Sequence, residues 1–204
     1  MTRASIELGD VTPHNIKQLK KLNTVVFPVT YNDKFYIDVL DAGELAKLAY
    51  YNDIVVGAVC CRIDTSENQR RLYIMTLGCL YPYRRLGIGS VMVNHILSYV
   101  EKDGNFDSIF LHVQVNNESA IEFYKKFGFE IVETKNHYYK RIEPADAHVL
   151  EKNLKNVKNC DSSGVAVTSN NTSDASKQNG IDSASNSHHN QSKATAVGAT
   201  NDSH

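Results

Sequence analysis

A glycine-containing segment between a strand-like run and a helical run carries the clearest chemical signal in the sequence. It reads Leu77-Gly78-Cys79-Leu80-Tyr81-Pro82-Tyr83-Arg84-Arg85-Leu86-Gly87-Ile88-Gly89. A turn at a helix N-terminus exposes backbone N–H groups, and the helix dipole adds partial positive charge. Gly87 and Gly89 allow an anion to approach the backbone because they have no Cβ. The segment predicts a pyrophosphate site, and the alternative is an ordinary strand-to-helix turn.

Two titratable side chains lie in predicted strands near this segment. Strand alternation predicts that Tyr73, Met75 and Leu77 share one face. His112 lies in the middle of a run of β-forming residues, and its ordinary pKa of about 6.5 suits proton transfer near neutral pH. The alternatives are a strand histidine satisfied by hydrogen bonds and a tyrosine present as a β-forming aromatic.

Periodicity and turn residues place these side chains on a sheet covered by helices. Thr12 has the features of a helix N-cap with Pro13 at the first helical position, and the residue before Pro28 avoids helical geometry. The predicted helices cover 13–26, 33–40, 87–102 and 117–127; the predicted strands cover 5–11, 45–51, 54–63, 71–80, 108–115, 129–134 and 147–154. Hairpins followed by alternating strands and helices predict an α/β (α+β) fold with a mixed sheet.

Composition separates a folded unit from a polar tail. The last aromatic residue of the 204-residue chain is Tyr139, and beyond Asn156 the chain is dominated by Ser, Asn, Thr, Ala and His. Such a segment buries too little apolar surface to offset its ordering entropy. We therefore expect one domain over residues 1–155 and a disordered tail over 156–204, in which His188 and His189 are solvated rather than metal-bound.

Charge and cysteine content indicate the cellular compartment and exclude some classes of binding partner. The formal net charge of -1 argues against broad nucleic-acid binding, which depends on Lys and Arg. The 4 cysteines form no CxxC pair, which indicates a reducing compartment without a disulfide framework or a zinc cluster. No run approaches membrane-spanning length, and the first residues lack the apolar stretch of a signal peptide. We expect a cytoplasmic protein, with the nucleus as a second compartment, that binds no metal, no membrane and no nucleic acid directly.

Two motifs together resemble the GNAT superfamily of N-acetyltransferases. Arg84-Arg85-Leu86-Gly87-Ile88-Gly89 fits the Arg/Gln-x-x-Gly-x-Gly/Ala motif that binds acetyl-coenzyme A in that family. Asn117-Glu118-Ser119-Ala120-Ile121-Glu122-Phe123-Tyr124 fits its Asn-x-x-Ala-x-x-x-Tyr segment. The resemblance implies a GNAT fold, with a mixed, mostly antiparallel seven-stranded sheet flanked by about four helices. It also implies a set of residues that contact acetyl-CoA: Leu77, Gly78, Cys79, Leu80, Arg84, Arg85, Leu86, Gly87, Ile88, Gly89, Ser90, Asn117, Ser119 and Tyr124.

Within the superfamily, residues 6–154 are similar to the N-terminal acetyltransferases of the NatE type. Besides the Arg84–Gly89 motif, the likeness rests on the segments 27–31 and 138–142. It implies a pocket for N-termini that begin with methionine followed by a hydrophobic residue, Met-Leu in particular. The implied pocket is walled by Phe27, Pro28, Val29, Tyr31 and Met75 and covered by Tyr138, Tyr139, Lys140, Arg141 and Ile142. A polarizable Met75 suits a thioether side chain, although each aromatic residue alone is equally typical of a core.

The same resemblance implies roles in acetyl transfer. An α-amino group has a pKa of about 7.7–8.0, against about 10.4 for lysine, so a modest base suffices for an N-terminus. Tyr73 and His112 are implied as general bases that work through ordered water. The N–H of Leu77 is implied to polarise the acetyl carbonyl, and Tyr124 to hydrogen-bond the departing sulfur.

Two alternatives to N-terminal acetylation stay open. One is an acetyltransferase of the same fold that acts on lysine side chains or small amines. The other is an acetyl-CoA-binding interaction subunit of low activity, although retention of both Tyr73 and His112 argues against it. The resemblance also implies secondary lysine acetylation, a complex at the ribosome with the auxiliary and catalytic subunits of NatA, and a role in sister-chromatid cohesion.

Overall fold

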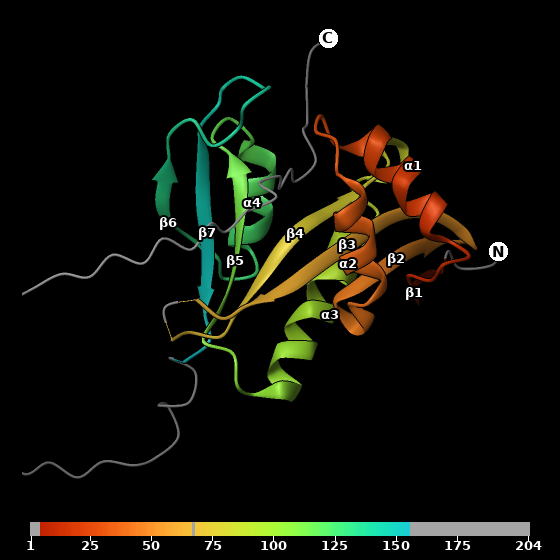
Figure 1. Ribbon diagram of the computed structural model, residues 1–204, viewed down its shortest axis with the longest axis horizontal. Helices are drawn as coiled ribbons and strands as arrows, with labels where there is room; N and C mark the ends of the chain where they lie inside the picture. The colour runs from red at the N-terminus through yellow and green to blue at the C-terminus, as the bar shows by residue number, and fades with distance from the viewer. Residues whose placement is uncertain (1–4, 67, 156–204) are drawn as a thin grey trace, which may run out of the picture.

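One seven-stranded sheet runs through the computed structural model, which describes residues 5–66 and 68–155 (Figure 1). Its strand order is β1-β2-β3-β4-β5-β7-β6, and neighbours are antiparallel except β4 and β5, which are parallel. The strands are β1 (Ile6–Asp10), β2 (Ala46–Tyr51), β3 (Ile54–Asp64), β4 (Arg71–Cys79), β5 (Ser108–Gln114), β6 (Glu130–Lys135) and β7 (Ala147–Asn153). The helices are α1 (Ile16–Val26), α2 (Asp33–Leu40), α3 (Ile88–Asp103) and α4 (Glu118–Lys125), with 3-10 turns η1 (Gly43–Leu45) and η2 (Tyr81–Tyr83).

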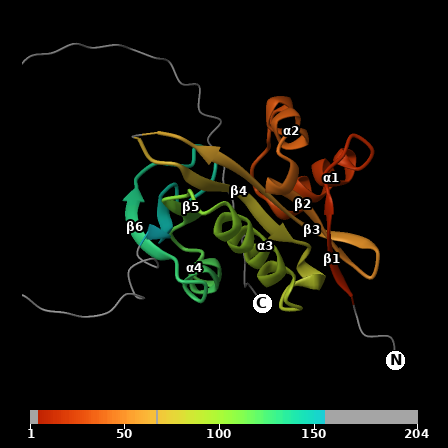
Figure 2. The ribbon, with the colours of Figure 1, turned by 90° about the horizontal axis from the view of Figure 1, so that it is seen from below.

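The helices cover both faces of the sheet, which confirms the expected mixed α/β fold. In Figure 2, α1 and α2 lie on one side of the strands, and α3 and α4 lie on the other. The apolar side chains accordingly form two clusters. Alternation along β4 divides its residues between them: Leu72 and Ile74 pack on the α3 side, while Tyr73 and Met75 pack on the α1 side.

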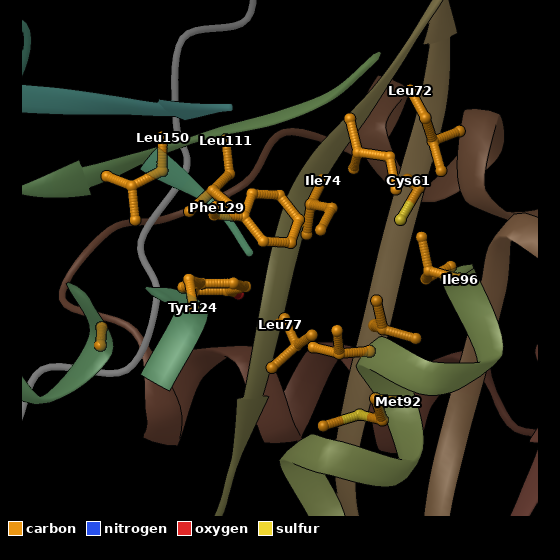
Figure 3. Packing of buried hydrophobic residues seen from close by; sticks show 14 of the residues in the cluster. Cys61, Leu72, Ile74, Leu77, Met92, Ile96, Leu111, Tyr124, Phe129 and Leu150 are labelled. Carbon is orange, nitrogen blue, oxygen red and sulfur yellow. The ribbon is translucent and has the colours of Figure 1, made fainter. Parts of the chain in front are cut away.

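A bulge in β4 interrupts that alternation. Cys60 is opposite Thr76 and Cys61 is opposite Ile74, so Met75 is an extra residue in β4. Beyond it the faces exchange, and Leu77 packs with Ile74 in the cluster on the α3 side (Figure 3). The prediction that Tyr73, Met75 and Leu77 share one face is therefore wrong for Leu77, because a period of two cannot reveal an inserted residue.

The parallel strands β4 and β5 pair over a short distance and then diverge. Their register joins Arg71 to Ser108, Leu72 to Ile109 and Tyr73 to Phe110, and Figure 1 shows the two strands separating beyond this point. Large side chains fill the core on the α3 side, where Tyr124 and Phe129 lie near Ile74 and Leu111 (Figure 3).

The predicted element boundaries agree with the structure to within two residues, except at the start of α1. That helix begins at Ile16 rather than at Pro13, so the prediction of Thr12 as its N-cap is wrong. Residues 13–15 form a turn in which the Asn15 side chain accepts the N–H of Thr12 at 2.8 Å. Asn15 determines where the helix begins, because its carboxamide stabilises the turn before the helix.

Several expectations concern residues or properties outside the fold itself. The predicted tail at 156–204, with His188 and His189, lies outside the described residues. Within 5–66 and 68–155, no helix is long and apolar enough to cross a membrane. Over the same residues, no three His, Cys, Asp or Glu side chains are grouped so that they could hold a metal ion.

Candidate active site

Tyr73 and His112 come from different strands and meet on the α1 side of the sheet. The Tyr73 hydroxyl lies 3.2 Å from Nδ1 of His112, and both residues are only 6% exposed. They meet because Tyr73 is opposite Phe110 in the parallel pair, which places His112 just beyond it on β5. The two side chains that the sequence predicted as bases therefore form one hydrogen-bonded pair, which we call the catalytic pair after that prediction.

Tyr138 covers this pair from the loop between β6 and β7. Its ring is nearly parallel to the His112 ring, with centroids 4.3 Å apart and an interplanar angle of 7°. Its hydroxyl lies 3.3 Å from that of Tyr73. The predicted cover residue is thus in direct contact with both predicted bases.

Sequence reasoning missed two further neighbours of Tyr73. The Phe110 ring stacks on it with centroids 4.8 Å apart, and the Arg62 guanidinium lies 5.1 Å from the ring centroid. Phe110 shares a face of β5 with His112, so alternation along that strand was an available signal. Arg62 is opposite Tyr73 in the β3–β4 register, and that pairing has no signal in the sequence because it depends on the bulge at Met75.

The predicted walls of the substrate pocket gather on the same face. Phe27, Val29, Tyr31 and Met75 belong to the apolar cluster that also contains Tyr73. The rings form a chain in which the centroids of Phe27 and Tyr31 are 6.0 Å apart and those of Tyr31 and Phe35 are 4.5 Å apart. Phe35, which the sequence places only within a helix, therefore packs against the predicted pocket residue Tyr31.

The remaining predicted pocket residues differ in exposure. Tyr139 is buried, and this burial raises the pKa of its hydroxyl above the usual range. Ile142 is half-buried, whereas Pro28, Lys140 and Arg141 are exposed. Of the predicted cover, Tyr139 is therefore the buried residue, Tyr138 and Ile142 are half-buried, and Lys140 and Arg141 lie at the surface.

Gly78 joins the pocket to the end of β4. A Cβ at Gly78 would lie 2.7 Å from Cγ1 of Val26 and 2.9 Å from Cζ of Phe27. The glycine therefore lets the end of α1 approach the strand closely. This contact is within the protein, so it is a different reason for glycine from the predicted contact with acetyl-CoA.

The predicted anion loop ends at the N-terminus of α3. Gly87 is the N-cap with φ +90°, and its missing side chain leaves the start of the helix without a side-chain cap. The first helical bond runs from the N–H of Val91 to the carbonyl of Gly87, so the N–H groups of residues 88–90 point outward from the helix end. These groups and the helix dipole favour an anion at this position.

Glycine is favoured at positions 87 and 89 for two different physical reasons. Nothing lies within 4 Å of a Cβ built on Gly87, so its positive φ is what favours glycine there. A Cβ on Gly89 would lie 3.1 Å from the Phe123 ring of α4. Both glycines thus have a reason within the protein itself, a left-handed backbone at Gly87 and helix packing at Gly89, and the approach of an anion to them stays a prediction.

The other predicted acetyl-CoA residues of this segment surround the helix start. Arg84 and Ser90 are half-buried, as are Cys79 and Leu80, while Arg85 and Leu86 are exposed and Ile88 is buried. Arg84 stacks over the Tyr81 ring, with its guanidinium carbon 5.3 Å from the centroid. Burial raises the pKa of the Cys79 thiol, so this side chain stays neutral near the loop.

The N–H of Leu77 points to the side of β4 from which β5 has diverged. The N–H of Leu80 donates to the Val56 carbonyl at 2.7 Å, and Leu77 is opposite Val59 in the same register. Antiparallel residues alternate between hydrogen-bonded and non-hydrogen-bonded pairs. Leu77, three positions before Leu80, is therefore in a non-hydrogen-bonded pair, and its N–H is directed away from β3.

The second predicted motif forms the start and the inner face of α4. Asn117 is the N-cap, and its side-chain oxygen accepts the N–H of Ala120 at 3.2 Å. Ser119 is exposed in the first turn, whereas Tyr124 is fully buried. The Tyr124 hydroxyl has no hydrogen-bond partner among the described residues. Burial raises its pKa above the usual range, so the hydroxyl remains a proton donor.

Comparisons with known proteins agree with this geometry. Residues 16–129 match a family model described as the acetyltransferase (GNAT) family. The chain is 85% identical over 155 residues to the probable N-acetyltransferase san of Drosophila melanogaster, which covers 76% of this chain and 84% of that protein. It is 76% identical over 153 residues to N-alpha-acetyltransferase 50 of Danio rerio, covering 75% of this chain and 91% of that protein.

A solved structure shares the fold. Arabidopsis thaliana Naa50 in complex with the bisubstrate analogue CoA-Ac-MVNAL matches with a TM-score of 0.70 and 56% identity, covering 74% of this chain and 99% of that chain. The family model spans more than half of the chain, and both sequence relatives exceed 75% identity. The chain therefore belongs to the GNAT family of acetyltransferases, among its N-alpha-acetyltransferases.

Proposed function

We propose that this protein moves the acetyl group of acetyl-CoA to the α-amino group of proteins that begin with methionine followed by a hydrophobic residue, Met-Leu in particular. The observation that carries the proposal is the catalytic pair, which lies on the same sheet face as the apolar side chains of Phe27 and Met75. The Arabidopsis Naa50 complex supports it, because the peptide part of the bisubstrate analogue bound there reads MVNAL.

The catalytic pair supplies a path for the proton that the amine must lose. An α-amino group with a pKa of about 7.7–8.0 is partly neutral at physiological pH, so a base of moderate strength suffices. The Tyr73 hydroxyl can accept from the amine side, through ordered water, and it also lies 3.2 Å from Nδ1 of His112 and 3.3 Å from the Tyr138 hydroxyl. Tyr138, stacked on His112, restricts the imidazole to one orientation.

The residues present fit acetyl-CoA. The start of α3 lacks a side-chain cap, so its outward N–H groups suit a pyrophosphate, and no acidic side chain precedes it in the loop from Leu80 to Gly87. Arg84 and Arg85 add positive charge beside them. When bound, acetyl-CoA supplies an electrophilic thioester carbonyl and a thiolate leaving group.

Two groups of this chain assist the transfer itself. The N–H of Leu77 is held by strand geometry on the side where β5 has diverged, and a fixed donor stabilises an oxygen as it gains negative charge. The buried Tyr124 hydroxyl stays protonated and can donate to the departing sulfur. Its burial also keeps bulk water from competing for that hydrogen bond.

Acetyl transfer by the purified protein to four short peptides tests the proposal. Three begin Met-Leu, Met-Lys and Ser-Glu, and the fourth is N-blocked and carries an internal lysine. We expect the highest kcat/KM for Met-Leu, because its two apolar side chains match the pocket that contains Phe27 and Met75. Activity only on the blocked peptide would move the function to lysine acetylation, and tight acetyl-CoA binding without turnover would favour an interaction subunit of low activity.

The cellular setting forms part of the same proposal. The resemblance to NatE-type subunits supports secondary lysine acetylation, association with the auxiliary and catalytic subunits of NatA at the ribosome, and a role in sister-chromatid cohesion. It also supports a cytoplasmic location with a second pool in the nucleus. Affinity purification of the tagged protein from cell fractions tests the complex and the location, and recovery without the NatA subunits from every fraction would reject the complex.

A further inference from the structure

We infer that Gln114 is a positioning residue that holds Tyr138 over His112. The inference rests on the proposed acetyl transfer and adds to it a side chain outside the catalytic pair, the pocket and the acetyl-CoA loop. Gln114 is the last residue of β5 and lies two positions after His112, so both side chains are on the same face of the strand.

The Gln114 side chain connects β5 to the loop that carries Tyr138. Its Nε2 donates to the carbonyl oxygen of Pro144 at 2.8 Å, and the residue is half-buried. Its backbone carbonyl accepts the N–H of Asn117 at 2.9 Å, at the N-cap of α4. One residue therefore joins the turn on the acetyl-CoA side to the loop on the peptide side.

Hydrogen bonds within the β6–β7 loop connect the Gln114–Pro144 bond to the position of Tyr138. The strand register closes at Lys135 opposite Ala147, and residues 136–146 extend beyond it. Within the loop, the N–H of Tyr139 donates to the Ala145 carbonyl at 2.8 Å, next to Pro144. A shift of Pro144 away from Gln114 is thus transmitted through Ala145 to Tyr139 and to its neighbour Tyr138.

A second connection comes from the residue after Gln114. The N–H of Val115 donates to the Asp146 carbonyl at 3.2 Å, and the Asp146 side chain accepts the N–H of His137 at 2.8 Å. His137 and Tyr139, the chain neighbours of Tyr138, are therefore both connected by hydrogen bonds in the loop to the end of β5. Figure 1 shows this loop at the same end of the sheet as the β5–α4 turn. The strand that supplies His112 also fixes the ring that stacks on it.

If Gln114 only stabilised the fold, its substitution would leave the stack of Tyr138 on His112 unchanged. A measurement of that stack, independent of activity, therefore separates a structural role from a positioning role. The parallel stack at 4.3 Å gives the His112 ring protons a ring-current shift from Tyr138. In NMR spectra of the full chain, Gln114→Met is expected to move the His112 ring signals toward their position in Tyr138→Ala. Unchanged His112 signals in Gln114→Met would overturn the inference, whether or not the wild type acetylates any peptide.

Kinetics on the Met-Leu peptide test the same point through a double-mutant cycle. Removing one neutral side-chain bond changes the equilibrium by about fivefold, so Gln114→Met is expected to lower peptide kcat/KM by about that factor with acetyl-CoA affinity unchanged. In the Tyr138→Ala background the same substitution should have no further effect. An additive loss, or an equal loss of acetyl-CoA affinity, would show that Gln114 acts other than through Tyr138.

A matched control is available on the same hairpin. The Thr134 hydroxyl and Nδ1 of His148 form an exposed bond of 2.8 Å between β6 and β7, one residue pair before the Lys135–Ala147 pair at which the loop that carries Tyr138 begins. Thr134→Val removes a bond of comparable length while leaving the connection to Pro144 intact. We expect wild-type kinetics and an unmoved His112 signal; a change equal to that of Gln114→Met would reject the specific role of Gln114.

Discussion

The Tyr73 hydroxyl and Nδ1 of His112 lie 3.2 Å apart, so two residues from different strands share one hydrogen bond, and the proposed mechanism places both on one proton path. Groups that act as a unit have non-additive effects when removed. We expect Tyr73→Phe or His112→Ala to lower kcat by about 10²–10⁴, and the double variant to be only slightly slower than the worse single variant. Single-turnover kinetics measure this, and calorimetry is expected to show unchanged acetyl-CoA affinity. Loss of acetyl-CoA binding in either single variant would make these residues structural.

Gly78→Ala tests the contact between β4 and the end of α1. The added methyl group would lie 2.7 Å from Cγ1 of Val26 and 2.9 Å from Cζ of Phe27, so these side chains or the helix end must shift. We expect the free energy of unfolding to fall by about 1–3 kcal/mol, and the peptide KM to rise because Phe27 moves. Urea unfolding of Gly78→Ala in a Val26→Ala, Phe27→Ala background supplies the comparison. If the methyl group costs as much there as in the wild type, the two side chains do not cause the strain.

Tyr124→Phe separates stability from catalysis at one buried atom. The hydroxyl is fully buried without a hydrogen-bond partner among the described residues, so its removal is expected to raise the free energy of unfolding by about 1 kcal/mol. The same change removes the proposed donor to the departing sulfur, so kcat should fall. Thermal unfolding and peptide kinetics measure the two effects, with Tyr99→Phe on α3 as a control that should leave kcat unchanged. A less stable Tyr124→Phe would mean that the hydroxyl is satisfied in the folded protein.

The buried thiol of Cys60 predicts a loss of stability at alkaline pH. Burial raises its pKa from the ordinary 9.0 to about 12, so the unfolded chain ionises this thiol at a lower pH than the folded chain. Its contribution is therefore intact below about pH 9 and declines toward pH 12, by about 1.4 kcal/mol per pH unit. Urea unfolding of the wild type and Cys60→Ala at pH 8, 9.5 and 10.5 compares the slopes. Equal slopes would mean that the thiol is accessible to solvent in the folded state.

Much of the fold was predictable because its apolar residues follow local patterns. Runs of β-forming residues in β2, β3 and β5 and the helical spacing in α3 each depend on neighbours within one element. The predictions failed where a single side chain or a tertiary contact determines the start of a helix or the face on which a strand residue lies. The carboxamide of Asn15 moves the start of α1, and the extra Met75 in β4 moves Leu77 to the other face.

The sequence indicated candidate residues for the active site but not the contacts among them. The motifs at Arg84–Gly89 and Asn117–Tyr124 and the resemblance they carry indicate which residues matter. The stacking of Tyr138 on His112 and the placement of Arg62 over Tyr73 depend on loop conformation and on strand register. Neither leaves a repeating pattern in the chain, because both join residues that are far apart in sequence or face one another across two strands.

The divergence of β4 and β5 constrains what can stand at position 124. The space beside the separating strands is filled by the rings of Tyr124 and Phe129 (Figure 3), so a small residue there would leave a cavity in the core. The chemistry proposed for the same position requires a hydroxyl. Phenylalanine satisfies the volume alone and serine the hydroxyl alone, so among the standard residues tyrosine combines both. The divergence of β4 and β5 thus requires one residue to fill the core and to supply the proposed hydroxyl. A substitution that keeps the side-chain volume loses the hydroxyl, and one that keeps a hydroxyl on a smaller side chain loses the volume.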